Sequence, residues 1–394
     1  MSRIEWVREN MSVLNRMSDT LKKGFPFSGA KIGVCLHIEY KTACLAITLR
    51  ESGADIYVAA SNPLSTKDGA VRELLNRGIN VFARGGEDIG EYRENIEKVL
   101  DNKPDLIIDD GGDMGIAAHH RGLQIRGVSE ETTTGTNRYR AMEARGELTF
   151  PVIDTNGAGC KHLFDNRFGT GQSALEGIMR STNISISGKR FVVCGFGDVG
   201  RGIALRAAGL GANVIVSETD PIRALEAYME GYMVLPIESA SRVGDIFITA
   251  TGNINAIDIE NIREMRSGAI LANAGHFDVE IDRRINEYEH EEVDRCIDRY
   301  QIDGKSIYLL GKGRLVNLVC ADGHPIEVMD MSFSLQALAA RYLLEAELEP
   351  RVYPYPHELD ELVASLKLSS AGLRITSLTE EQKLYMGGYK SENE

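Results

Sequence analysis

Residue types that can transfer protons or bind ligands gather in three short runs in the first third of the chain. They are residues 36–41 (Leu-His-Ile-Glu-Tyr-Lys), 61–68 (Ser-Asn-Pro-Leu-Ser-Thr-Lys-Asp) and 109–113 (Asp-Asp-Gly-Gly-Asp). Each run follows a short apolar stretch that predicts a buried strand. Because ligands of open parallel sheets bind outside the carboxyl ends of the strands, we expect one pocket to collect all three runs.

Two more polar runs follow these three. Residues 129–135 read Ser-Glu-Glu-Thr-Thr-Thr-Gly, and residues 154–166 contain Lys161 and end in Phe-Asp-Asn. Taken singly, such residues have simpler explanations. A lone histidine at a strand end is more often a satisfied polar group than a catalyst, and Lys161 alone could be a solvated lysine at a helix start. Their common placement on loops after strands favours one shared site.

A glycine-rich turn lies near the middle of the chain. Residues 191–194 predict a buried parallel strand, and Gly195, Gly197 and Gly200 follow it in G-x-G-x-x-G spacing. The helix expected over residues 199–210 would direct its N-terminal amides and its dipole at a pyrophosphate. The order of strand, glycines and helix predicts a dinucleotide-binding unit. The alternative is a glycine-rich turn that binds nothing.

The next strand indicates which dinucleotide to expect. Residues 213–217 (Asn-Val-Ile-Val-Ser) lead to Glu218, where an acidic side chain receives both ribose hydroxyls of NAD and repels the 2′-phosphate of NADP. Arg223 is a nearby residue that a phosphate-binding role could recruit. We therefore predict NAD as the cofactor.

Strands and helices alternate in the part of the chain that must position the first polar runs. Strands are expected at residues 31–36, 55–60, 80–83 and 105–109, separated by helices at 41–52, 69–77 and 92–100. This βαβ alternation predicts a parallel sheet. An amphipathic helix is expected over residues 1–25, and a helix over 331–347 is expected to pack back on this half.

The fold class predicted is α/β, with two parallel-sheet Rossmann-like domains and a short C-terminal helical tail. A chain of 394 residues is long enough for two cores, since single cores stop growing at roughly 250–300 residues. We expect a discontinuous substrate-binding domain, formed by residues 1–168 and 329–370. The NAD-binding Rossmann domain is expected over residues 169–328 and the tail over 371–394.

Charge and composition exclude some classes of partner. A net charge of −14 does not favour nucleic acid, so we expect a small-molecule substrate. No apolar run approaches the roughly 20 residues that span a bilayer, and the N-terminus lacks the pattern of a signal peptide. We therefore expect no membrane association and a cytoplasmic location. The cysteines lack C-x-x-C spacing, so we expect buried free thiols and no metal site.

Six strings occur together and in order along the chain. They are residues 109–113, 129–135, 164–166 (Phe-Asp-Asn), 195–200 (Gly-Phe-Gly-Asp-Val-Gly), 275–282 (Gly-His-Phe-Asp-Val-Glu-Ile-Asp) and 313–318 (Gly-Arg-Leu-Val-Asn-Leu). Together they resemble the adenosylhomocysteinase family, which are S-adenosylhomocysteine hydrolases with tightly bound NAD. Members of that family oxidise the 3′-hydroxyl of the nucleoside, expel homocysteine from C5′ after loss of the C4′ proton, add water and restore the alcohol. The net reaction is hydrolysis of a thioether.

The resemblance implies roles for individual residues. Lys161 and Asp165 are expected to contact the 3′-hydroxyl, with Lys161 as its base, which requires that desolvation or cationic neighbours lower its pKa. Asp110 is expected to transfer protons near C4′ and C5′. The implied catalytic residues are His37, Asp110, Glu131, Lys161, Asp165 and His276. The implied cofactor residues are Thr132, Thr133, Thr134, Asn166, Gly195, Gly197, Asp198, Val199, Gly200, Glu218, Arg223, Asn253, Ala274, Gly275, His276 and Asn317.

The sequence departs from the family pattern at the residues that would face the purine. In the adenosine enzymes, residues 36–42 would read Leu-His-x-Thr-x-Glu/Gln-Thr, and the Glu or Gln accepts from the 6-amino group of adenine. Here the threonine position holds Glu39, and the Glu/Gln position holds Lys41. Lysine only donates, so it would oppose the amino group, and a buried unpaired group costs about 1–3 kcal/mol. Hypoxanthine instead presents a carbonyl oxygen to Lys41 and an N1–H to Glu39.

We therefore predict S-inosyl-L-homocysteine as the substrate, as in the S-inosyl-L-homocysteine hydrolase variant of the family. His324 is expected as a third residue near the base. The alternative is that Glu39 and Lys41 pair with each other, and that the substrate is S-adenosyl-L-homocysteine. Two other classes stay open, a non-catalytic NAD-binding relative and an oxidoreductase similar to D-2-hydroxyacid dehydrogenases.

Departures elsewhere concern the cofactor and the assembly. Thr170, Arg223 and Lys312 stand where the family has a cysteine, an asparagine and a glutamate. The sequence also lacks the Lys-Pro-Asp-x-Tyr-Arg-Tyr tail that, in longer members, reaches a neighbour's NAD site. The residues that could partly substitute for it are Tyr385, Tyr389 and Lys390. Family members are usually tetramers, so a homo-oligomer is expected.

Overall fold

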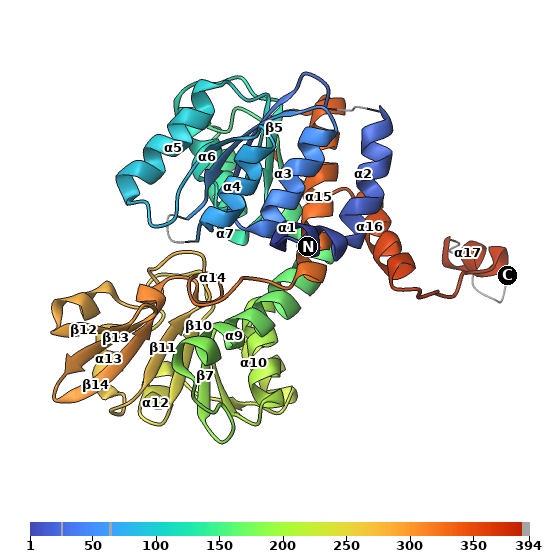
Figure 1. Ribbon diagram of the computed structural model, residues 1–394. Coiled ribbons are helices and arrows are strands. Elements are labelled where there is room, and N and C mark those ends of the chain that lie inside the picture. The colour runs from blue at the N-terminus through green and yellow to red at the C-terminus, as the bar shows by residue number, and fades with distance from the viewer. Residues whose placement is uncertain (25–26, 63–64, 388–394) are drawn as a thin grey trace.

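The computed structural model describes residues 1–24, 27–62 and 65–387 of the chain. The chain forms two halves, each built on one sheet with helices on its faces (Figure 1). This confirms the predicted α/β class. Tyr389 and Lys390 lie outside the described residues, as do the last residue of the helix expected over 1–25 and the middle of the run 61–68.

The first sheet has seven parallel strands in the order β15-β6-β5-β4-β1-β2-β3. The chain runs outward from β1 to β3 on one side and from β4 to β6 on the other. The strand order therefore reverses between β1 and β4, which is where open α/β sheets form ligand crevices. The strands are β1 (Lys31–Leu36), β2 (Asp55–Ala60), β3 (Asn80–Phe82), β4 (Leu106–Asp109), β5 (Gly127–Glu130), β6 (Val152–Asp154) and β15 (Val352–Pro354).

Helices cover both faces of this sheet and enclose two apolar cores. On one face lie α1 (Arg3–Glu9), α2 (Ser12–Gly24), α3 (Tyr40–Glu51), α4 (Asp68–Asn76), α15 (Ile326–Glu345) and α16 (His357–Ser370). On the other lie α5 (Ile89–Asp101), α6 (Asp113–His120) and α7 (Thr133–Ala144). α15, α16 and β15 come from the far end of the chain and lie with this first sheet. The domain bounds expected from the sequence stay a prediction.

The second sheet has eight strands in the order β12-β13-β14-β11-β10-β7-β8-β9. Its strand order reverses between β7 and β10, directly beside the glycine-rich turn. The strands are β7 (Arg190–Cys194), β8 (Asn213–Ser217), β9 (Met233–Val234), β10 (Ile246–Thr249), β11 (Ile270–Asn273), β12 (His290–Asp294), β13 (Ile297–Ile302) and β14 (Lys305–Leu310). The helices of this half are α9 (Thr170–Thr182), α10 (Asp198–Gly209), α11 (Pro221–Met229), α12 (Ile237–Ser241), α13 (Ile259–Glu264) and α14 (Val316–Val319).

The second sheet departs from parallel pairing at one edge. There β12 and β13 run antiparallel to each other, and β13 runs antiparallel to β14. Asp303 and Gly304 connect β13 to β14, and both have positive φ (49° and 76°). An Asp-Gly pair in this conformation forms the two-residue turn that suits the twist of a hairpin. This dipeptide was the signal that could have predicted the hairpin.

The helix expected over residues 1–25 is two helices, α1 and α2, broken at Asn10 and Met11. The carboxylate of Asp330, a fully buried residue of α15, accepts hydrogen bonds from the backbone N–H groups of Val13 and Leu14 at 2.9–3.1 Å. These are donors of the first turn of α2, which lack partners within their own helix. A side chain more than 300 residues away in sequence therefore sets where α2 begins.

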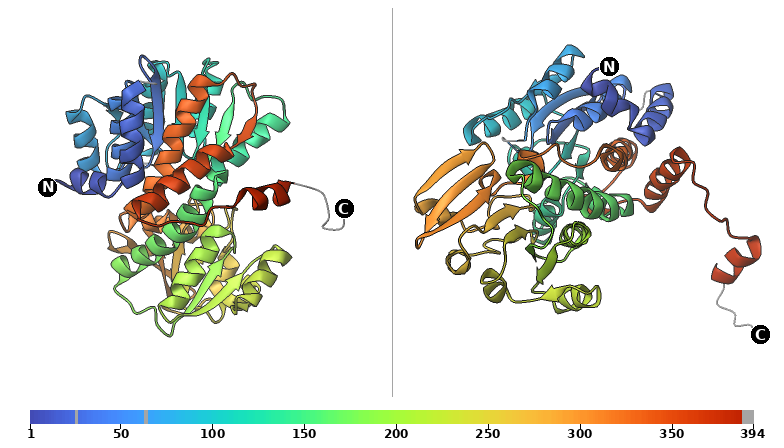
Figure 2. Two further views of the ribbon diagram at one scale, coloured as in Figure 1. Left: turned by 90° about the vertical axis from the view of Figure 1, so that its right-hand side faces the viewer. Right: turned by 60° about the horizontal axis from the view of Figure 1, so that its bottom comes forward.

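The C-terminal segment lies apart from both halves. All of residues 371–387 are exposed, and α17 (Glu380–Gly387) projects away from the sheets in each view (Figures 1 and 2). Among the described residues, no helix combines the length and the apolar character needed to cross a membrane.

Candidate active site

A cavity of about 470 Å³ lies between the two halves. Its walls include residues that directly follow β1, β4 and β5 of the first sheet, and β10 and β11 of the second. This volume is typical of small-molecule sites. The predicted residues that line it are His37, Glu39, Lys41, Asp110, Glu131, Thr132, Thr133, Thr134, Lys161, Asp165, Asn166, Gly197, Asp198, Val199, Arg223, Ala274, Gly275, His276, Asn317 and His324.

Four predicted residues do not line this cavity in the part of the chain that the structure describes. They are Gly195, Gly200, Glu218 and Asn253. The two glycines lie behind the turn: a side chain at Gly200 would collide with the backbone carbonyl of Gly195. Asn253 is exposed, and its side-chain oxygen accepts from the backbone N–H of Ile254 at 2.8 Å. The cofactor role expected for Asn253 stays a prediction.

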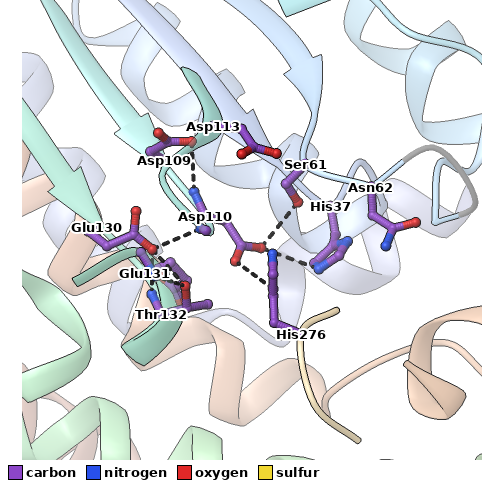
Figure 3. Close-up of polar contacts among 12 residues, drawn as sticks. His37, Ser61, Asn62, Asp109, Asp110, Asp113, Glu130, Glu131, Thr132 and His276 are labelled. Atoms are coloured by element: carbon purple, nitrogen blue, oxygen red, sulfur yellow. Dashed lines mark hydrogen bonds and ion pairs between the residues drawn. The ribbon is translucent and has the colours of Figure 1, made fainter. Parts of the chain in front are cut away.

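Asp110 lies between two histidines (Figure 3). Its carboxylate oxygens are 3.3 Å from His37 Nε2 and 3.6 Å from His276 Nδ1, and the Ser61 hydroxyl donates to it at 3.2 Å. Burial lowers the pKa of His37 to about 4; His276 contributes in the same direction, and Asp110 opposes the shift. His37 is therefore neutral near pH 7. A neutral imidazole beside a carboxylate can pass a proton to or from a group between them.

The turn that carries Asp110 needs glycine. Gly111 and Gly112 have φ of 97° and 83°, a conformation that other residues rarely adopt. A side chain at Gly111 would also collide with the ring of His276. The ligating atoms of His37, Asp110 and His276 lie within 4.8 Å of one another. This geometry is compatible with a metal ion as well as with proton transfer, so the expectation of no metal stays a prediction.

Glu130 joins this turn to the threonine run, a role that the sequence analysis did not foresee. Its Oε1 accepts from the backbone N–H groups of Gly111 (2.9 Å) and Thr132 (2.8 Å) and from the Thr132 hydroxyl (2.7 Å). A side chain at Gly135 would collide with the Glu130 carboxyl group. Burial raises the pKa of Glu130 well above its ordinary value, and the carboxylates of Asp109 and Asp110 add to the shift. Glu130 therefore holds two cavity loops together through its Oε1.

Lys161 forms the centre of a second polar cluster. Its ammonium lies 2.7 Å from Asp165 Oδ2, 3.0 Å from Glu131 Oε1 and 3.1 Å from Asn166 Oδ1. The residue ends a short helix, α8 (Gly159–Lys161), and a π-helix follows at His162–Gly169. Asp360 of α16 accepts from the backbone N–H groups of Gly159 and Cys160 at 2.6 and 2.9 Å and so fixes the start of α8. The location of Lys161 thus depends on a helix from the end of the chain.

Lys161 can act as a base only if its pKa is lowered, and in this structure its pKa is raised. Burial disfavours its charged form, but the carboxylates of Asp165 and Glu131 outweigh burial and raise its pKa above the ordinary value. Burial raises the pKa of Glu131 to about 7, although Lys161 opposes the shift. Burial also acts on Asp165, but Lys161 and His324 reverse the effect and lower its pKa. Near neutral pH, Glu131 is therefore the member of this cluster that changes charge.

Two polar side chains of α15 complete the Lys161 cluster. The Ser332 hydroxyl donates to Asp165 Oδ2 at 2.6 Å, and Gln336 Nε2 donates to Glu131 Oε2 at 2.6 Å. Both are fully buried. They are one helical turn apart, so they share a face of α15. Buried polar residues at this spacing were the signal that the sequence analysis missed.

Glu39 and Lys41 both line the cavity and contact each other. The Lys41 ammonium lies 2.9 Å from Glu39 Oε2 and donates to the backbone carbonyl of Asp322 at 3.0 Å. Glu39 is also the N-cap of α3, since it accepts from the backbone N–H groups of Lys41 and Thr42. His324 contacts Asp165 through its Nδ1 and Thr170 through Nε2, so it belongs with the Lys161 cluster.

The residues of the second half fit a dinucleotide. Gly197 faces open space, because an added Cβ would meet only the Arg223 guanidinium at 3.6 Å. The side-chain oxygen of Asn317, a cavity residue, is buried without a hydrogen-bond partner among the described residues. Glu218, directly after β8, accepts from the backbone N–H of Phe196 at 2.6 Å. Burial acts on Glu218, but the backbone hydrogen bonds outweigh it and lower its pKa, so the carboxylate is charged.

Two Rossmann-like halves around one cavity, with a glycine-rich turn in the second, define an NAD-dependent α/β enzyme. The family model of the S-adenosyl-L-homocysteine hydrolases matches residues 1–124, and the model of their NAD-binding domain matches residues 166–323. The chain therefore belongs to the adenosylhomocysteinase family and is a hydrolase that uses NAD.

Relatives match over nearly the whole chain. The S-inosyl-L-homocysteine hydrolase of Methanocaldococcus jannaschii is 53% identical, covering 98% of this chain and 96% of the relative. The adenosylhomocysteinase of Thermococcus kodakarensis is 52% identical, covering 98% and 94%. Among solved structures, the dipicolinate synthase chain from Bacillus halodurans has a TM-score of 0.51 at 15% identity, covering 81% of this chain and all of that one. This structural similarity to dipicolinate synthase supports the fold alone.

Proposed function

We propose that this protein hydrolyses S-inosyl-L-homocysteine to inosine and L-homocysteine, reversibly. The observation that carries the proposal is the buried ammonium of Lys41 in the cavity wall. It forms an ion pair with Glu39 and donates to the carbonyl of Asp322, and because an ammonium has three hydrogens it can also donate to a ligand. The 6-oxo group of hypoxanthine accepts such a bond, whereas the 6-amino group of adenine presents a second donor.

Glu39 has the complementary capacity. Its Oε1 accepts a hydrogen bond from the backbone N–H of Thr42 at 3.3 Å, and a carboxylate oxygen can accept two. A second acceptor position on Oε1 suits the N1–H of hypoxanthine, which adenine lacks. Lys41 and Glu39 together therefore favour an oxo-purine at both edge positions.

The other cavity residues fit the chemistry of the family. NAD bound in the second half supplies reversible oxidation of the 3′-hydroxyl. The Lys161 ammonium holds the ribose oxygens, and Glu131, with a pKa of about 7, accepts the hydroxyl proton. Asp110 and neutral His37 lie together outside the Lys161 cluster, where they transfer the C4′ proton and protonate the leaving sulfur.

S-adenosyl-L-homocysteine is the alternative substrate. The contact between Glu39 and Lys41 favours it, because a satisfied pair leaves the purine to backbone groups. Relatives with the two names are 53% and 52% identical, so overall identity does not decide between them. The test is a comparison of kcat/KM for the two thioethers with the NAD-loaded enzyme. A preference for the inosyl compound supports the proposal, and a clear preference for the adenosyl compound overturns it.

We also propose that the chain acts as a homo-oligomer in the cytoplasm, with the tetramer of the family as the expected form. Support for an oligomer comes from exposed apolar side chains. On and beside α11 these are Ile222, Leu225, Tyr228, Met229 and Met233; on the C-terminal segment they are Leu373, Ile375, Leu378, Leu384, Tyr385 and Met386. Light scattering of the purified chain tests the proposal, and a mass of one chain would contradict it.

A further inference from the structure

Ser65 contacts the ring of His37 from outside the cavity. It is buried, and it is not among the described residues that line the cavity. Its hydroxyl oxygen lies 2.7 Å from His37 Nδ1 and 3.0 Å from the backbone carbonyl oxygen of Asn62. The other ring nitrogen of His37, Nε2, faces Asp110 (Figure 3). Ser65 therefore acts on the site through the imidazole of His37.

The two hydrogen bonds of Ser65 determine which nitrogen of His37 carries a hydrogen. A backbone carbonyl oxygen can only accept, so the Ser65 hydroxyl donates its single hydrogen to Asn62. Toward His37 the hydroxyl oxygen must then accept, which places a hydrogen on Nδ1. His37 is neutral near pH 7, since burial lowers its pKa to about 4. Because a neutral imidazole carries one ring hydrogen, Nε2 is left without one.

The contact between His37 and Asp110 agrees with this tautomer. Nε2 lies 3.3 Å from Asp110 Oδ2, which is longer than the about 2.7–2.9 Å of a charge-assisted N–H···O⁻ bond. The opposite tautomer would place a hydrogen on Nε2, and the Ser65 hydroxyl would have to donate to Nδ1 instead of to Asn62. The carbonyl of Asn62 would then lose a hydrogen bond that this structure contains.

A bare Nε2 beside Asp110 is a proton acceptor. Asp110 Oδ2 already accepts from the Ser61 hydroxyl at 3.2 Å, so both atoms of the contact with His37 are acceptors. Two facing acceptors in a buried site are stabilised when a proton lies between them. A proton taken from a ligand at this place is therefore held jointly by Nε2 and Asp110, and the Nδ1–H bond to Ser65 persists in that state.

We propose that Ser65 is a positioning residue that holds neutral His37 as the Nδ1–H tautomer, so that Nε2 accepts a proton before it donates one. In the proposed reaction the C4′–H bond breaks, its proton goes to Nε2, and its electron pair forms the C4′–C5′ double bond. The C5′–S bond breaks with its electron pair on sulfur, and the sulfur then takes the proton from Nε2. This inference rests on the proposed function, which supplies the substrate.

The tautomer is measured on the full-length protein without substrate. Nitrogen NMR of isotopically labelled histidine rings distinguishes a protonated ring nitrogen from a bare one, and His37→Gln identifies the signals of His37 among the eight histidines. Near pH 7 we expect a hydrogen on Nδ1 and none on Nε2. In Ser65→Ala we expect a mixture of the two tautomers, because Nδ1–H has lost its acceptor. A hydrogen on Nε2 in the parent protein overturns the proposal.

Kinetics of the NAD-loaded enzyme give the second readout. Ser65→Ala should lower kcat for thioether hydrolysis about tenfold, because part of His37 then has the wrong tautomer. KM for the thioether should stay unchanged, since Ser65 does not line the cavity. Ser65→Thr keeps the hydroxyl and should restore most of kcat. Ser52→Ala is the matched control, because Ser52 is also buried, donates to the carbonyl of Thr48 at 2.8 Å and lies outside the cavity.

The outcomes separate this proposal from the proposed function. If Ser65→Ala keeps the kcat of the parent, or if Ser65→Thr is as slow as Ser65→Ala, the positioning role is overturned and the proposed function stands. A rise in KM with unchanged kcat also overturns the role, because tautomer control acts on proton transfer. If the parent hydrolyses only the adenosyl thioether, the purine assignment fails and the Ser65 variants are compared on that substrate. If it hydrolyses neither thioether, the proposed function and the catalytic part of this proposal are both rejected.

Discussion

The Lys161 ammonium is surrounded by the oxygens of Asp165, Glu131 and Asn166 within 3.1 Å. Two of these neighbours are carboxylates, so removing the Lys161 proton would leave like charges facing each other in a buried site. This is why its pKa is raised although burial acts in the opposite direction. The carboxyl group of this cluster whose pKa lies near neutrality, at about 7, is Glu131.

Glu131 predicts a pH dependence for turnover. Because its pKa is raised from 4.5 to about 7, the carboxyl group is protonated below pH 7 and ionised above it. We expect kcat to rise with pH through about 7, since only the ionised form accepts a proton. Glu131→Gln should remove this inflection and lower kcat by about 100-fold or more. Steady-state rates between about pH 5.5 and 9 provide the measurement, with the exposed Glu147→Gln as the control.

A Glu131→Gln variant that kept the same pH profile would assign the inflection to another group. The proton-acceptor role of Glu131 would then be withdrawn.

Lys41→Gln should shift substrate preference toward adenine. Glutamine restores an amide oxygen that accepts from the 6-amino group, and it removes the donor that opposes it. We expect the ratio of kcat/KM for the inosyl and adenosyl thioethers to fall by about 10- to 100-fold. Lys67→Gln is the matched control, because Lys67 donates to the neighbouring carbonyl of Ala321 but does not line the cavity. An unchanged ratio in Lys41→Gln would remove the basis of the purine assignment.

The elements around the cavity are held in place by buried side chains that act on backbone donors. Asp330 caps α2, Asp360 caps α8, and Glu130 joins the turn at residues 109–113 to the turn that begins α7. All three contacts link segments that are distant in sequence or lie on different strands. The positions of the side chains that line the cavity therefore depend on packing between elements more than on their own local sequence.

Substitutions of Glu130 test whether contacts between elements hold the loops of the cavity in place. Glu130→Ala leaves the backbone N–H groups of Gly111 and Thr132 buried without their acceptor, so we expect a loss of about 2 kcal/mol in the free energy of unfolding. A fall in kcat should accompany it, because the loops of Asp110 and Thr132 loosen together. Glu130→Gln keeps an acceptor oxygen at this position, so it should retain most of the stability and most of kcat.

Denaturant unfolding and kcat measured on the same samples provide the comparison. If Glu130→Ala unfolded like the parent, or if Glu130→Gln were as damaged as Glu130→Ala, hydrogen bonds accepted by the residue 130 side chain would not be what holds the two turns.

The whole molecule has two sheets whose strand ends face a common space, and a C-terminal segment that packs on neither (Figure 2). Since residues 371–387 are all exposed, their apolar side chains lack the burial that normally accounts for them. Contact with another copy of the chain would bury these apolar side chains.

Deletion of residues 373–394 should therefore lower the mass of the assembly and leave each half folded. Far-UV circular dichroism should keep the signal of the two α/β halves, because no described residue of the deleted segment is buried. Light scattering at matched protein concentration measures the mass. An unchanged mass would show that the segment is not required for assembly.

Local sequence determined much of the architecture. The strands at 31–36, 55–60 and 213–217 were predicted with the bounds that the structure has, and the glycine-rich turn, Lys41 and Glu39 were identified as ligand-facing residues. These features depend on short-range properties, such as apolar runs, backbone freedom at glycine and the donor or acceptor type of a side chain. Such properties can be read from a few neighbouring residues.

Only the tertiary structure decided the charge state of Lys161, the break between α1 and α2, and the participation of Ser332, Gln336 and Glu130. Each depends on groups that come together from different segments, as when a carboxylate of one element meets the ammonium or the N–H groups of another. A pKa is set by burial and by the charges within a few ångströms. The sequence shows which residues can titrate, but their neighbours in space determine at which pH they do so.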